Sequence, residues 1–322
     1  MRRLLQFLIS ASSTAILIAV VLGYLGHFLF ELDLLAHFRL HFLFLCVPVA
    51  LIAGLLRRWG ALWRSLVAAV LALAGLSVLW EAPHRVGEGV EVTVMAANLY
   101  QRNAEPDEMK RALLNVDADV LVTMETTKAI LSGPNSLALK YPYRLSLGTS
   151  GQILRTVIWS KYPMRDGRLM LEDRIEPTGA TAVVEFSPDV EFSVLGLHFA
   201  HNIVGNQLEQ IEALDRISEG LPKPLIVIGD FNATAWSYAM RRVAQLTATQ
   251  RIGGFRVTWK GNYPTPFGNI SAPFGLQIDH ALISNEIGVR EMFTVDIPGS
   301  DHKAVVAHLV MPILSAADRS DR

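Results

Sequence analysis

Six polar clusters, each directly after an apolar, strand-like run, stand out in the last three-quarters of the chain. Their side chains are carboxylates, amides and imidazoles, the groups that hold a hard metal ion and transfer protons. Placed together at the ends of buried strands, such groups are what a metal-assisted phosphoryl enzyme needs. The clusters contain Asn98, Glu125, His198, Asp230 with Asn232, Asp279 with His280, and Asp301 with His302.

Taken one at a time, these residues predict little. An Asp at a strand end is often a helix cap or an Asx turn, and for Asp230 alone that interpretation is the better one. A lone His198 is more often a hydrogen-bonded structural histidine than a catalytic one, and Glu125 could simply cap the segment that follows it. Asp301 could belong to a turn. The order and context of the whole set are what favour a functional site.

The set resembles the endonuclease/exonuclease/phosphatase superfamily, the fold of DNase I-like nucleases, abasic-site endonucleases, inositol-polyphosphate 5-phosphatases and neutral sphingomyelinases. The resemblance covers about Val90 to Val310, and it implies a Mg²⁺-dependent phosphoric ester hydrolase. Its most specific elements are Gly229-Asp230-Phe231-Asn232 and Ser300-Asp301-His302. The remaining elements are Ala-Ala-Asn98-Leu, Thr-Met-Glu125-Thr, Gly-Leu-His198-Phe and Ile278-Asp279-His280.

The resemblance implies a metal site with few protein ligands. Glu125 would be the main carboxylate ligand of Mg²⁺, with Asn98 close to it, and Asp301 could join the site. Mg²⁺ keeps several waters and binds substrate phosphate, which suits a sparse carboxylate set, and Mn²⁺ is the alternative ion. The single cysteine of the chain, Cys46, lies in an apolar run, so thiolate ligands are excluded from the site.

The resemblance also implies the catalytic roles. Asp230 would orient or deprotonate the attacking water, and Asn232 would donate a hydrogen bond to the phosphoryl oxygens as charge develops there. His302 would contact the phosphate, with Asp279 accepting a hydrogen bond from it and fixing its tautomer. His198 would stand on the opposite side of the phosphate, near the leaving group. The expected reaction is in-line attack of water without a covalent enzyme intermediate.

Alternation of apolar residues predicts the elements that position these groups. The pattern predicts helices over Pro106–Asn115 and Asn206–Gly220, interspersed among more numerous strands. This order indicates an α/β fold, a four-layer α/β sandwich of two packed mixed sheets flanked by helices. The predicted strands are Glu91–Ala97, Val120–Met124, Thr156–Ser160, Thr181–Phe186, Glu191–Leu197, Leu225–Ile228, Ile278–Ile283 and Ala304–Val310.

Three apolar runs precede this domain and predict three transmembrane helices. They are Leu8–Phe30, Phe38–Leu56 and Leu66–Trp80, the last of which reaches spanning length only when counted from Ala61. A signal peptide followed by two core helices is one alternative, although the first run is long for such a peptide and lacks an Ala-x-Ala cleavage site. The other alternative is that the second and third runs form a buried helical hairpin of a soluble protein. Such a hairpin requires a polar stripe at helical period, which neither of these two runs has.

Basic residues predict the orientation of these runs. Arg2 and Arg3 precede the first run, and Arg57, Arg58 and Arg64 lie between the second and third. The positive-inside rule then places the N-terminus in the cytoplasm. Three spans predict a multi-pass protein of the cell inner membrane with an extracytoplasmic, periplasmic catalytic domain.

Composition divides the chain into four parts. Residues 1–82 form the membrane region, 83–89 a linker with Pro and Gly, 90–312 the catalytic domain and 313–322 a disordered tail. Acidic residues outnumber basic ones after the membrane region, so the domain lacks the overall basic footprint of a tight, non-specific nucleic-acid binder. No protein partner is evident.

Three functions agree with this sequence. The first is a membrane-anchored phosphodiesterase of the nuclease type, the second a lipid head-group phosphatase or a hydrolase resembling phospholipases and sphingomyelinases, and the third a non-catalytic binding domain on a membrane anchor. Every catalytic position expected from the resemblance is present, which disfavours the third. Trp236 and Tyr238 could stack on a base or rest on lipid, with core or rim packing as the default expectation.

Overall fold

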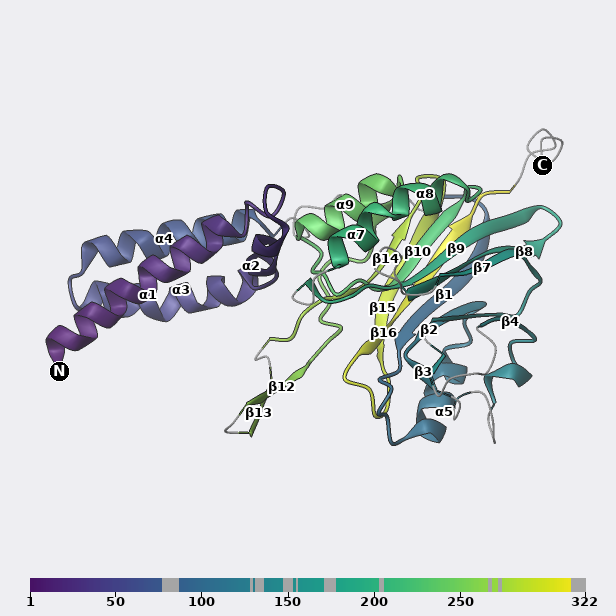
Figure 1. Cartoon of the computed structure of the whole chain (residues 1–322), viewed down its shortest axis with the longest axis horizontal. Coiled ribbons are helices and arrows are strands. Elements are labelled where there is room, and N and C mark those ends of the chain that lie inside the picture. Colours follow the sequence, from purple (N-terminus) through teal and green to yellow (C-terminus); the bar gives the residue numbers. More distant parts are fainter. Residues whose placement is uncertain are drawn as a thin grey trace. The chain divides into compact units, whose positions relative to one another are not determined.

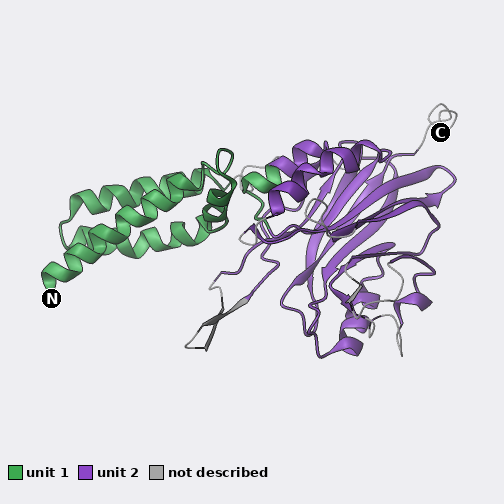
Figure 2. Ribbon diagram, viewed as in Figure 1, with its two compact units in different colours: residues 1–81, 233–241 green, residues 82–232, 242–322 purple. Residues whose placement is uncertain are grey.

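The chain divides into two compact units (Figure 2). Met1–Glu81 and Ala233–Arg241 form one, here called the helical unit, and Ala82–Asn232 and Arg242–Arg322 form the other, the sheet unit. The helical unit thus contains a short segment taken from the middle of the sheet-unit sequence. The computed structural model describes residues 1–76, 87–127, 130, 136–146, 153–154, 156–170, 178–202, 206–265, 268–271 and 274–313.

The first sheet of the sheet unit is mixed and six-stranded. β1 and β2 run parallel, and the other neighbours pair antiparallel. The register sets Asn98, the last residue of β1, opposite Met124, so Asn98 and Glu125 reach the same edge of the sheet. In spatial order the strands are β15 (Gly288–Asp296), β16 (Lys303–Met311), β1 (Val90–Asn98), β2 (Val120–Met124), β6 (Val157–Ser160) and β4 (Tyr143–Leu145).

The second sheet is also mixed and six-stranded. β9 and β10 are parallel with Asp230 opposite His198, and β10 and β14 are antiparallel with Asp230 opposite Asp279. Three predicted site residues are therefore cross-strand neighbours in one row. In spatial order the strands are β11 (Gln250–Arg251), β14 (Asp279–Ile283), β10 (Leu225–Asp230), β9 (Val190–His198), β8 (Thr178–Ser187) and β7 (Met164–Met170).

A continuous apolar core packs the two sheets face to face. It takes alternate residues of strands from both sheets, such as Val94 and Val122 from the first and Val194 and Ile228 from the second. The approach is close at Gly196, where an added Cβ would lie 2.6 Å from a methyl carbon of Val122. This packing holds the ends of the two sheets in a fixed relation, which positions the polar groups there.

Helices cover the outer faces of the sheets (Figure 1). α5 (Pro106–Val116) packs on the first sheet through Met109 and Leu113. The single helix predicted over Asn206–Gly220 is divided at Ala213 into α7 (Gln207–Glu212) and α8 (Leu214–Glu219). The smaller elements are η3 (Leu137–Leu139), the pair β3 (Thr126–Thr127) and β5 (Ile153–Leu154), and the pair β12 (Asn262–Thr265) and β13 (Gly268–Ser271).

The prediction of an α/β fold with two mixed sheets and helices is confirmed. β2 has the predicted bounds, and the other predicted strands differ from the observed ones at their ends by up to three residues. The sequence did not predict β7, β15 or the helix α9 (Tyr238–Leu246). Most of the predicted linker, 83–89, and of the predicted tail, 313–322, lies outside the described residues.

The helical unit packs α1, α3 and α4 against one another. η1 and α2 connect α1 to α3, and α9 begins in this unit and ends in the sheet unit. The bounds are α1 (Arg2–Leu22), η1 (Phe30–Leu32), α2 (Asp33–His37), α3 (Arg39–Leu55) and α4 (Trp59–Ala74).

The prediction of three membrane-spanning helices is wrong for the described chain, which has one such helix or at most two, and the multi-pass arrangement built on three spans is not supported. α1 is long and apolar enough to cross a bilayer, and the chain over Phe30–His37 and Arg39–Leu55 qualifies only as a bent pair, with a 57° break. α4 has 16 residues, a rise of about 24 Å, whereas the hydrocarbon core is about 30 Å thick. Residues 77–80 of the third predicted run lie outside the described residues.

Candidate active site

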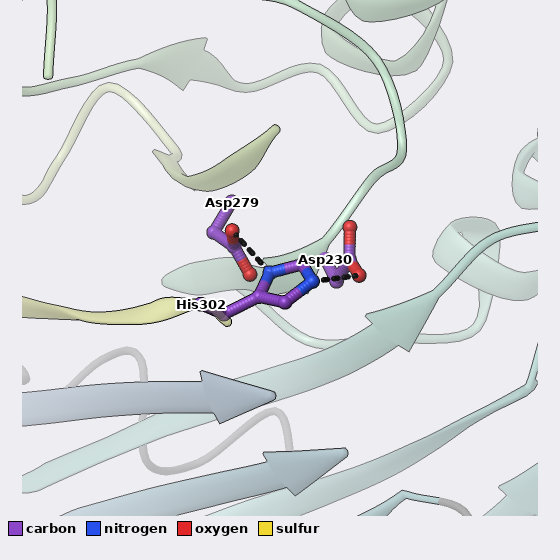
Figure 3. Close-up of side chains that lie close together, drawn as sticks. All are labelled: Asp230, Asp279 and His302. Carbon is purple, nitrogen blue, oxygen red and sulfur yellow. Dashed lines mark hydrogen bonds and ion pairs between the residues drawn. The ribbon is translucent and has the colours of Figure 1, made fainter. Parts of the chain in front are cut away.

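Three buried side chains meet at the ends of β10, β14 and β16 (Figure 3). His302 Nδ1 lies 2.9 Å from Asp279 Oδ2, and His302 Nε2 lies 3.9 Å from Asp230 Oδ2. His198 approaches the same oxygen of Asp230 from β9, with Nε2 at 3.7 Å. Both carboxylates thus face one imidazole, on opposite sides of its ring, and Asp230 faces a second imidazole as well.

The loop before β16 holds His302 in this position. Ser300 Oγ donates to the backbone carbonyl of Asn98 at 2.8 Å and accepts a hydrogen bond from the His302 N–H at 3.1 Å. Thr258 Oγ1 accepts hydrogen bonds from the N–H groups of Ile278 and Asp279. Nothing in the sequence indicated Thr258, because a threonine in a loop carries no signal for this role.

Asn98 connects the two sheets at their edge. Its Nδ2 donates to Glu125 Oε1 at 3.1 Å and to Asp230 Oδ2 at 3.0 Å, so one amide binds a carboxylate from each sheet. Its Oδ1 accepts a hydrogen bond from the Tyr100 N–H. Glu125 Oε2 is fixed in turn by the N–H of Gln101 at 2.8 Å. Asn98 and Glu125 are therefore adjacent, as the resemblance implied.

Asn232 is buried in the loop directly after β10. Its N–H donates to Asp230 Oδ1 at 2.9 Å, and its Nδ2 donates to the Phe199 carbonyl at 2.8 Å. Gln207 Nε2 donates to the backbone carbonyls of Phe231 and Asn232, which holds the loop from the side of α7. Gln207 lay inside a predicted helix, and nothing in its sequence context indicated this contact.

Several residues at the sheet edge that carries the site have strained backbone conformations. Glu125 and Asn232 have φ values of 52° and 46°, in the left-handed region that residues other than glycine rarely adopt. Tyr100, two residues after Asn98 in the chain, has φ 55°. Each such residue costs about 1–3 kcal/mol and persists where the surroundings over-determine it, as they do at functional sites.

The pKa values of the two carboxylates, Asp230 and Asp279, are shifted in opposite directions. Burial opposes ionisation of Asp230, but the imidazoles of His302 and His198 and the hydrogen bonds from Asn232 and Asn98 outweigh it and lower its pKa. Burial raises the pKa of Asp279, with opposition from His302 and support from Asp230. Burial opposes the protonated form of His302, yet Asp279 and Asp230 raise its pKa to about 10. The site at neutral pH thus contains an imidazolium between two acids.

Asp301 stands apart from this cluster. Its Oδ2 accepts a hydrogen bond from Trp259 Nε1 at 3.0 Å. With Tyr100, Lys260 and His302 it lines a cavity of about 510 Å³ beside the imidazole. The structure therefore places Asp301 at a cavity wall rather than in the cluster, and its predicted role as a metal ligand stays a prediction.

The donor set suits a divalent cation. One ligand atom each from Asp230, Asp279 and His302 falls within 4.8 Å of the others. Asp279 Oδ1 is buried and has no hydrogen-bond partner among the described residues, so an oxygen is left for a cation or a polar ligand. Glu125 adds a carboxylate on the far side of Asn98. Carboxylate oxygens of this kind fit Mg²⁺ or Mn²⁺, whereas His302, protonated at neutral pH, has no free lone pair to offer a metal.

Two mixed sheets whose strand ends present this donor set define a metal-dependent phosphoesterase. Residues 95–302 match the model of the Endonuclease/Exonuclease/phosphatase family, and the chain belongs to that family. The prediction from the sequence motifs is confirmed at this level. No curated protein sequence matches the chain.

Solved structures of similar fold have diverse activities. Sphingomyelinase C from Streptomyces griseocarneus is 15% identical with a TM-score of 0.52, covering 68% of this chain and 99% of that one. Beta toxin from Staphylococcus aureus, crystallised with bound magnesium ions, has 15% identity, TM-score 0.51 and coverage of 68% and 99%. A 3′ phosphatase from Neisseria, bound to a product DNA hairpin, has 14% identity, TM-score 0.50 and coverage of 67% and 98%. These likenesses show the fold alone.

Proposed function

We propose that the chain is a membrane-anchored, metal-dependent phosphodiesterase that hydrolyses its substrate by in-line attack of water. The observation that carries this proposal is the continuous hydrogen-bonded and ionic series at the sheet edge. It runs from Glu125 through Asn98 to Asp230, and through His302 to Asp279. A series of this kind presents an anion, an imidazolium and amide donors to one phosphoester.

The different charges of Asp230 and His302 give these two residues different catalytic roles. Asp230, held ionised, orients the attacking water or takes its proton, while the imidazolium of His302 donates a hydrogen bond to a phosphoryl oxygen. Asp279 holds the Nδ1–H of His302 and so fixes which nitrogen faces the phosphate. Asn232 offers a side-chain N–H, and His198 stands on the leaving-group side. A separate acid and base suit a reaction that forms no covalent intermediate.

The metal ion would be held by Glu125 with Asn98 beside it, and Asp301 would join from the wall of the cavity. A hard cation supplies Lewis-acid stabilisation of charge on the phosphoryl oxygens. The buried carboxylates of Asp230 and Asp279 support a cation at this edge, and Mg²⁺ is the proposed ion, with Mn²⁺ as the alternative. The magnesium in the beta toxin structure supports the same choice.

The helical unit has apolar side chains outside and polar ones inside, the inverse of a water-soluble domain. This distribution supports its proposed role as a membrane anchor. Large apolar side chains such as Phe44, Leu51 and Val70 are exposed on its surface, whereas Ser13 and Ser65 are buried between its helices. Small or polar residues inside and large apolar ones outside are the pattern of helices that pack in lipid. We propose that α1 is the retained anchor, since it packs on α3 and α4, and that Arg2 and Arg3 keep its N-terminus in the cytoplasm.

A second candidate is hydrolysis of a phosphoester in a lipid head group. The specific observation in its favour is that the segment directly after Asn232 belongs to the helical unit, so about six residues of chain connect the active-site loop to Tyr238 of that unit. A non-catalytic binding domain is disfavoured, because the site carries every group that the reaction uses.

The test is an assay of the purified full-length chain in detergent micelles with Mg²⁺. The substrates are bis-p-nitrophenyl phosphate, plasmid DNA, RNA and phospholipid vesicles, each compared with Asp230→Ala and His302→Ala. We expect hydrolysis that either substitution reduces by at least about 100-fold. Hydrolysis that survives both substitutions would refute the site. Preference for vesicles over DNA and RNA would establish the second candidate.

A further inference from the structure

The segment Ala233–Arg241 follows Asn232 directly and belongs to the helical unit (Figure 2, green). The chain therefore leaves the sheet unit immediately after an active-site residue. It comes back at Arg242, inside the continuous helix α9, so α9 begins in one unit and ends in the other. The conformation of this segment therefore bears on the active-site residue bonded to it.

Asp33 binds the first turn of α9. Its carboxylate accepts hydrogen bonds from the N–H groups of Tyr238 and Ala239, at 2.7 and 2.9 Å. Helix N–H groups in the first turn have no partner inside the helix and favour an anion. Asp33 is only 1% exposed, and a polar group buried to this extent is costly unless hydrogen bonds satisfy it. Asp33, at the start of α2, thus adds to the local cap Ser237 by binding the first turn of a helix 205 residues further along the chain.

Arg39 binds the same segment at Trp236, two residues before the first residue of α9. Its Nη1 donates to the carbonyls of Trp236 and Gly75 at 3.1 and 2.9 Å, and its Nη2 donates to the carbonyl of Gly23 at 3.2 Å. The guanidinium also lies 4.2 Å from the ring centre of Tyr24. A rigid guanidinium fork can hold several acceptors in fixed geometry, which a lysine cannot. One side chain therefore joins three separate stretches of the chain.

Trp236 fills the space beside these polar contacts. It is 2% exposed and packs with Leu76 and Ala235, with Leu40 and Leu43 against the cluster. Its Nε1 donates to the carbonyl of Ala36 at 2.7 Å. A buried indole with its N–H satisfied is a strong anchor, because it combines a large apolar area with a directed bond. The expectation that Trp236 packs in a core is thereby confirmed, in the core of the helical unit.

We infer that Asp33 and Arg39 are positioning residues of the phosphoesterase, because they fix the segment Ala233–Arg241 and through it the place of Asn232 in the active site. The inference rests on the proposed function. Asn232 is held from the N-terminal side by its N–H bond to Asp230, at a φ of 46°. With the chain after Ala233 released, that strained conformation keeps its hydrogen bonds to Asp230, Phe199 and Gln207 but loses the constraint on its C-terminal side. The helical unit is then a working part of the enzyme in addition to an anchor.

The first test measures hydrolysis of bis-p-nitrophenyl phosphate by the full-length chain in detergent with Mg²⁺. We expect Arg39→Gln and Asp33→Asn to lower kcat about ten- to a hundred-fold with KM within about two-fold, since misplacement of a catalytic group acts on the chemical step. Trp236→Phe, which removes only the indole N–H and some bulk, is expected to lower kcat less. The matched control is Arg64→Gln, because Arg64 donates to Ser13 and Ser10 of α1 instead. Its kcat should equal that of the wild type.

Equal kcat values for the wild type and all three segment variants, with melting curves that show folded protein, would overturn the inference and leave the proposed function intact. An equal loss in Arg64→Gln would overturn it too, since general weakening of the helical unit would then explain the result. A wild-type chain without hydrolysis would instead refute the proposed function.

Amide hydrogen exchange provides a readout that does not need activity. Arg39→Gln and Asp33→Asn are expected to speed exchange at Tyr238 and Ala239 and also at Asn232, whose N–H is bonded to Asp230. Arg64→Gln is expected to leave exchange at Asn232 unchanged. Faster exchange confined to Ala233–Arg241, with Asn232 as in the wild type, would show that the segment does not position the active-site loop.

Discussion

At the scale of single residues, the site depends on Asn98. Its amide donates to a carboxylate at the end of each sheet, Glu125 and Asp230. Carboxylates that converge without donors repel one another and take up a proton. The shared amide satisfies an oxygen of each carboxylate, and its hydrogen bond helps to lower the pKa of Asp230. This explains why an uncharged side chain belongs between the two acids.

Glu125→Gln tests the assignment of the metal. The substitution keeps the shape of the side chain but removes the charge that a hard cation prefers. We expect the Mg²⁺ concentration for half-maximal hydrolysis to rise about 10- to 100-fold, measured by metal titration of the full-length chain. Glu108→Gln is the control, because Glu108 pairs with Arg111 on the surface of α5. An unchanged Mg²⁺ requirement in Glu125→Gln would contradict the assignment.

Asp279→Asn tests the role of the imidazolium. The pKa of His302 is raised to about 10 chiefly by Asp279, against the effect of burial. Removal of the anion disfavours the protonated ring, so the pKa of His302 falls. Because catalysis uses the protonated form, we expect the alkaline limb of kcat, near pH 10 in the wild type, to move to lower pH.

The comparison for this pH profile is Asp296→Asn, since Asp296 lines the cavity beside His302 but pairs with Lys303 at 2.8 Å. Its alkaline limb should match that of the wild type. A limb that stays in place in Asp279→Asn would show that protonation of His302 does not control the rate.

The sequence was enough to find the charged residues of the site but not their supports. Asp230, His198 and Asp279 end apolar runs, so alternation alone predicts that they share a sheet edge, and the register confirms it. Thr258 and Gln207 act through neutral hydrogen bonds to backbone groups far away in sequence. Such bonds depend on tertiary placement, which no local pattern encodes.

At the scale of elements, the close pairing of β9 with β10 fixes the positions of His198 and Asp230 at the sheet edge. Gly229 precedes Asp230 with φ 147°, and an added Cβ would lie 2.0 Å from the carbonyl oxygen of Leu197 on the neighbouring strand. Only a glycine permits this approach. The sequence motif Gly-Asp-Phe-Asn therefore encodes a backbone requirement as well as side-chain chemistry.

Gly229→Ala is expected to lower the free energy of unfolding by at least about 1–3 kcal/mol, because the strands must separate or the backbone must adopt another conformation. Thermal melting of the full-length chain measures the effect. Gly220→Ala is the matched control, since an added Cβ at Gly220 meets nothing within 4 Å. The explanation fails if both variants melt at the wild-type temperature.

Elements differ in how far the sequence predicts them. β2 has the predicted bounds because all five of its residues are buried and apolar or small, a pattern that only a central strand gives. α9 was not predicted, although Ser237 directly before it is a local cap whose Oγ accepts a hydrogen bond from the Met240 N–H at 3.1 Å. The contribution of Asp33, which accepts from the N–H groups of Tyr238 and Ala239, comes from a distant helix and has no local signal.

At the scale of the whole molecule, hydropathy over-counted the membrane-spanning helices. Apolar runs of similar composition fold here into one long helix, a bent pair and a helix of 16 residues. Composition does not show a 57° break near Phe38, nor that Asp33 and Arg39 pair with a segment far away in sequence. Asp33 and Arg39, polar residues beside or within apolar runs, thus make structural hydrogen bonds that only the tertiary fold shows.

The retention of α1 is the last prediction. If α1 is an anchor, the chain should stay in the membrane fraction after an alkaline carbonate wash, and its intact mass should include α1. The physical reason is the packing of α1 on α3 and α4, with Arg64 of α4 donating to Ser13 of α1 at 3.2 Å. Cleavage of α1 would leave that arginine without its acceptors and expose the apolar faces of α3 and α4. A shorter chain, released by the wash and lacking α1, would show that α1 is a signal peptide.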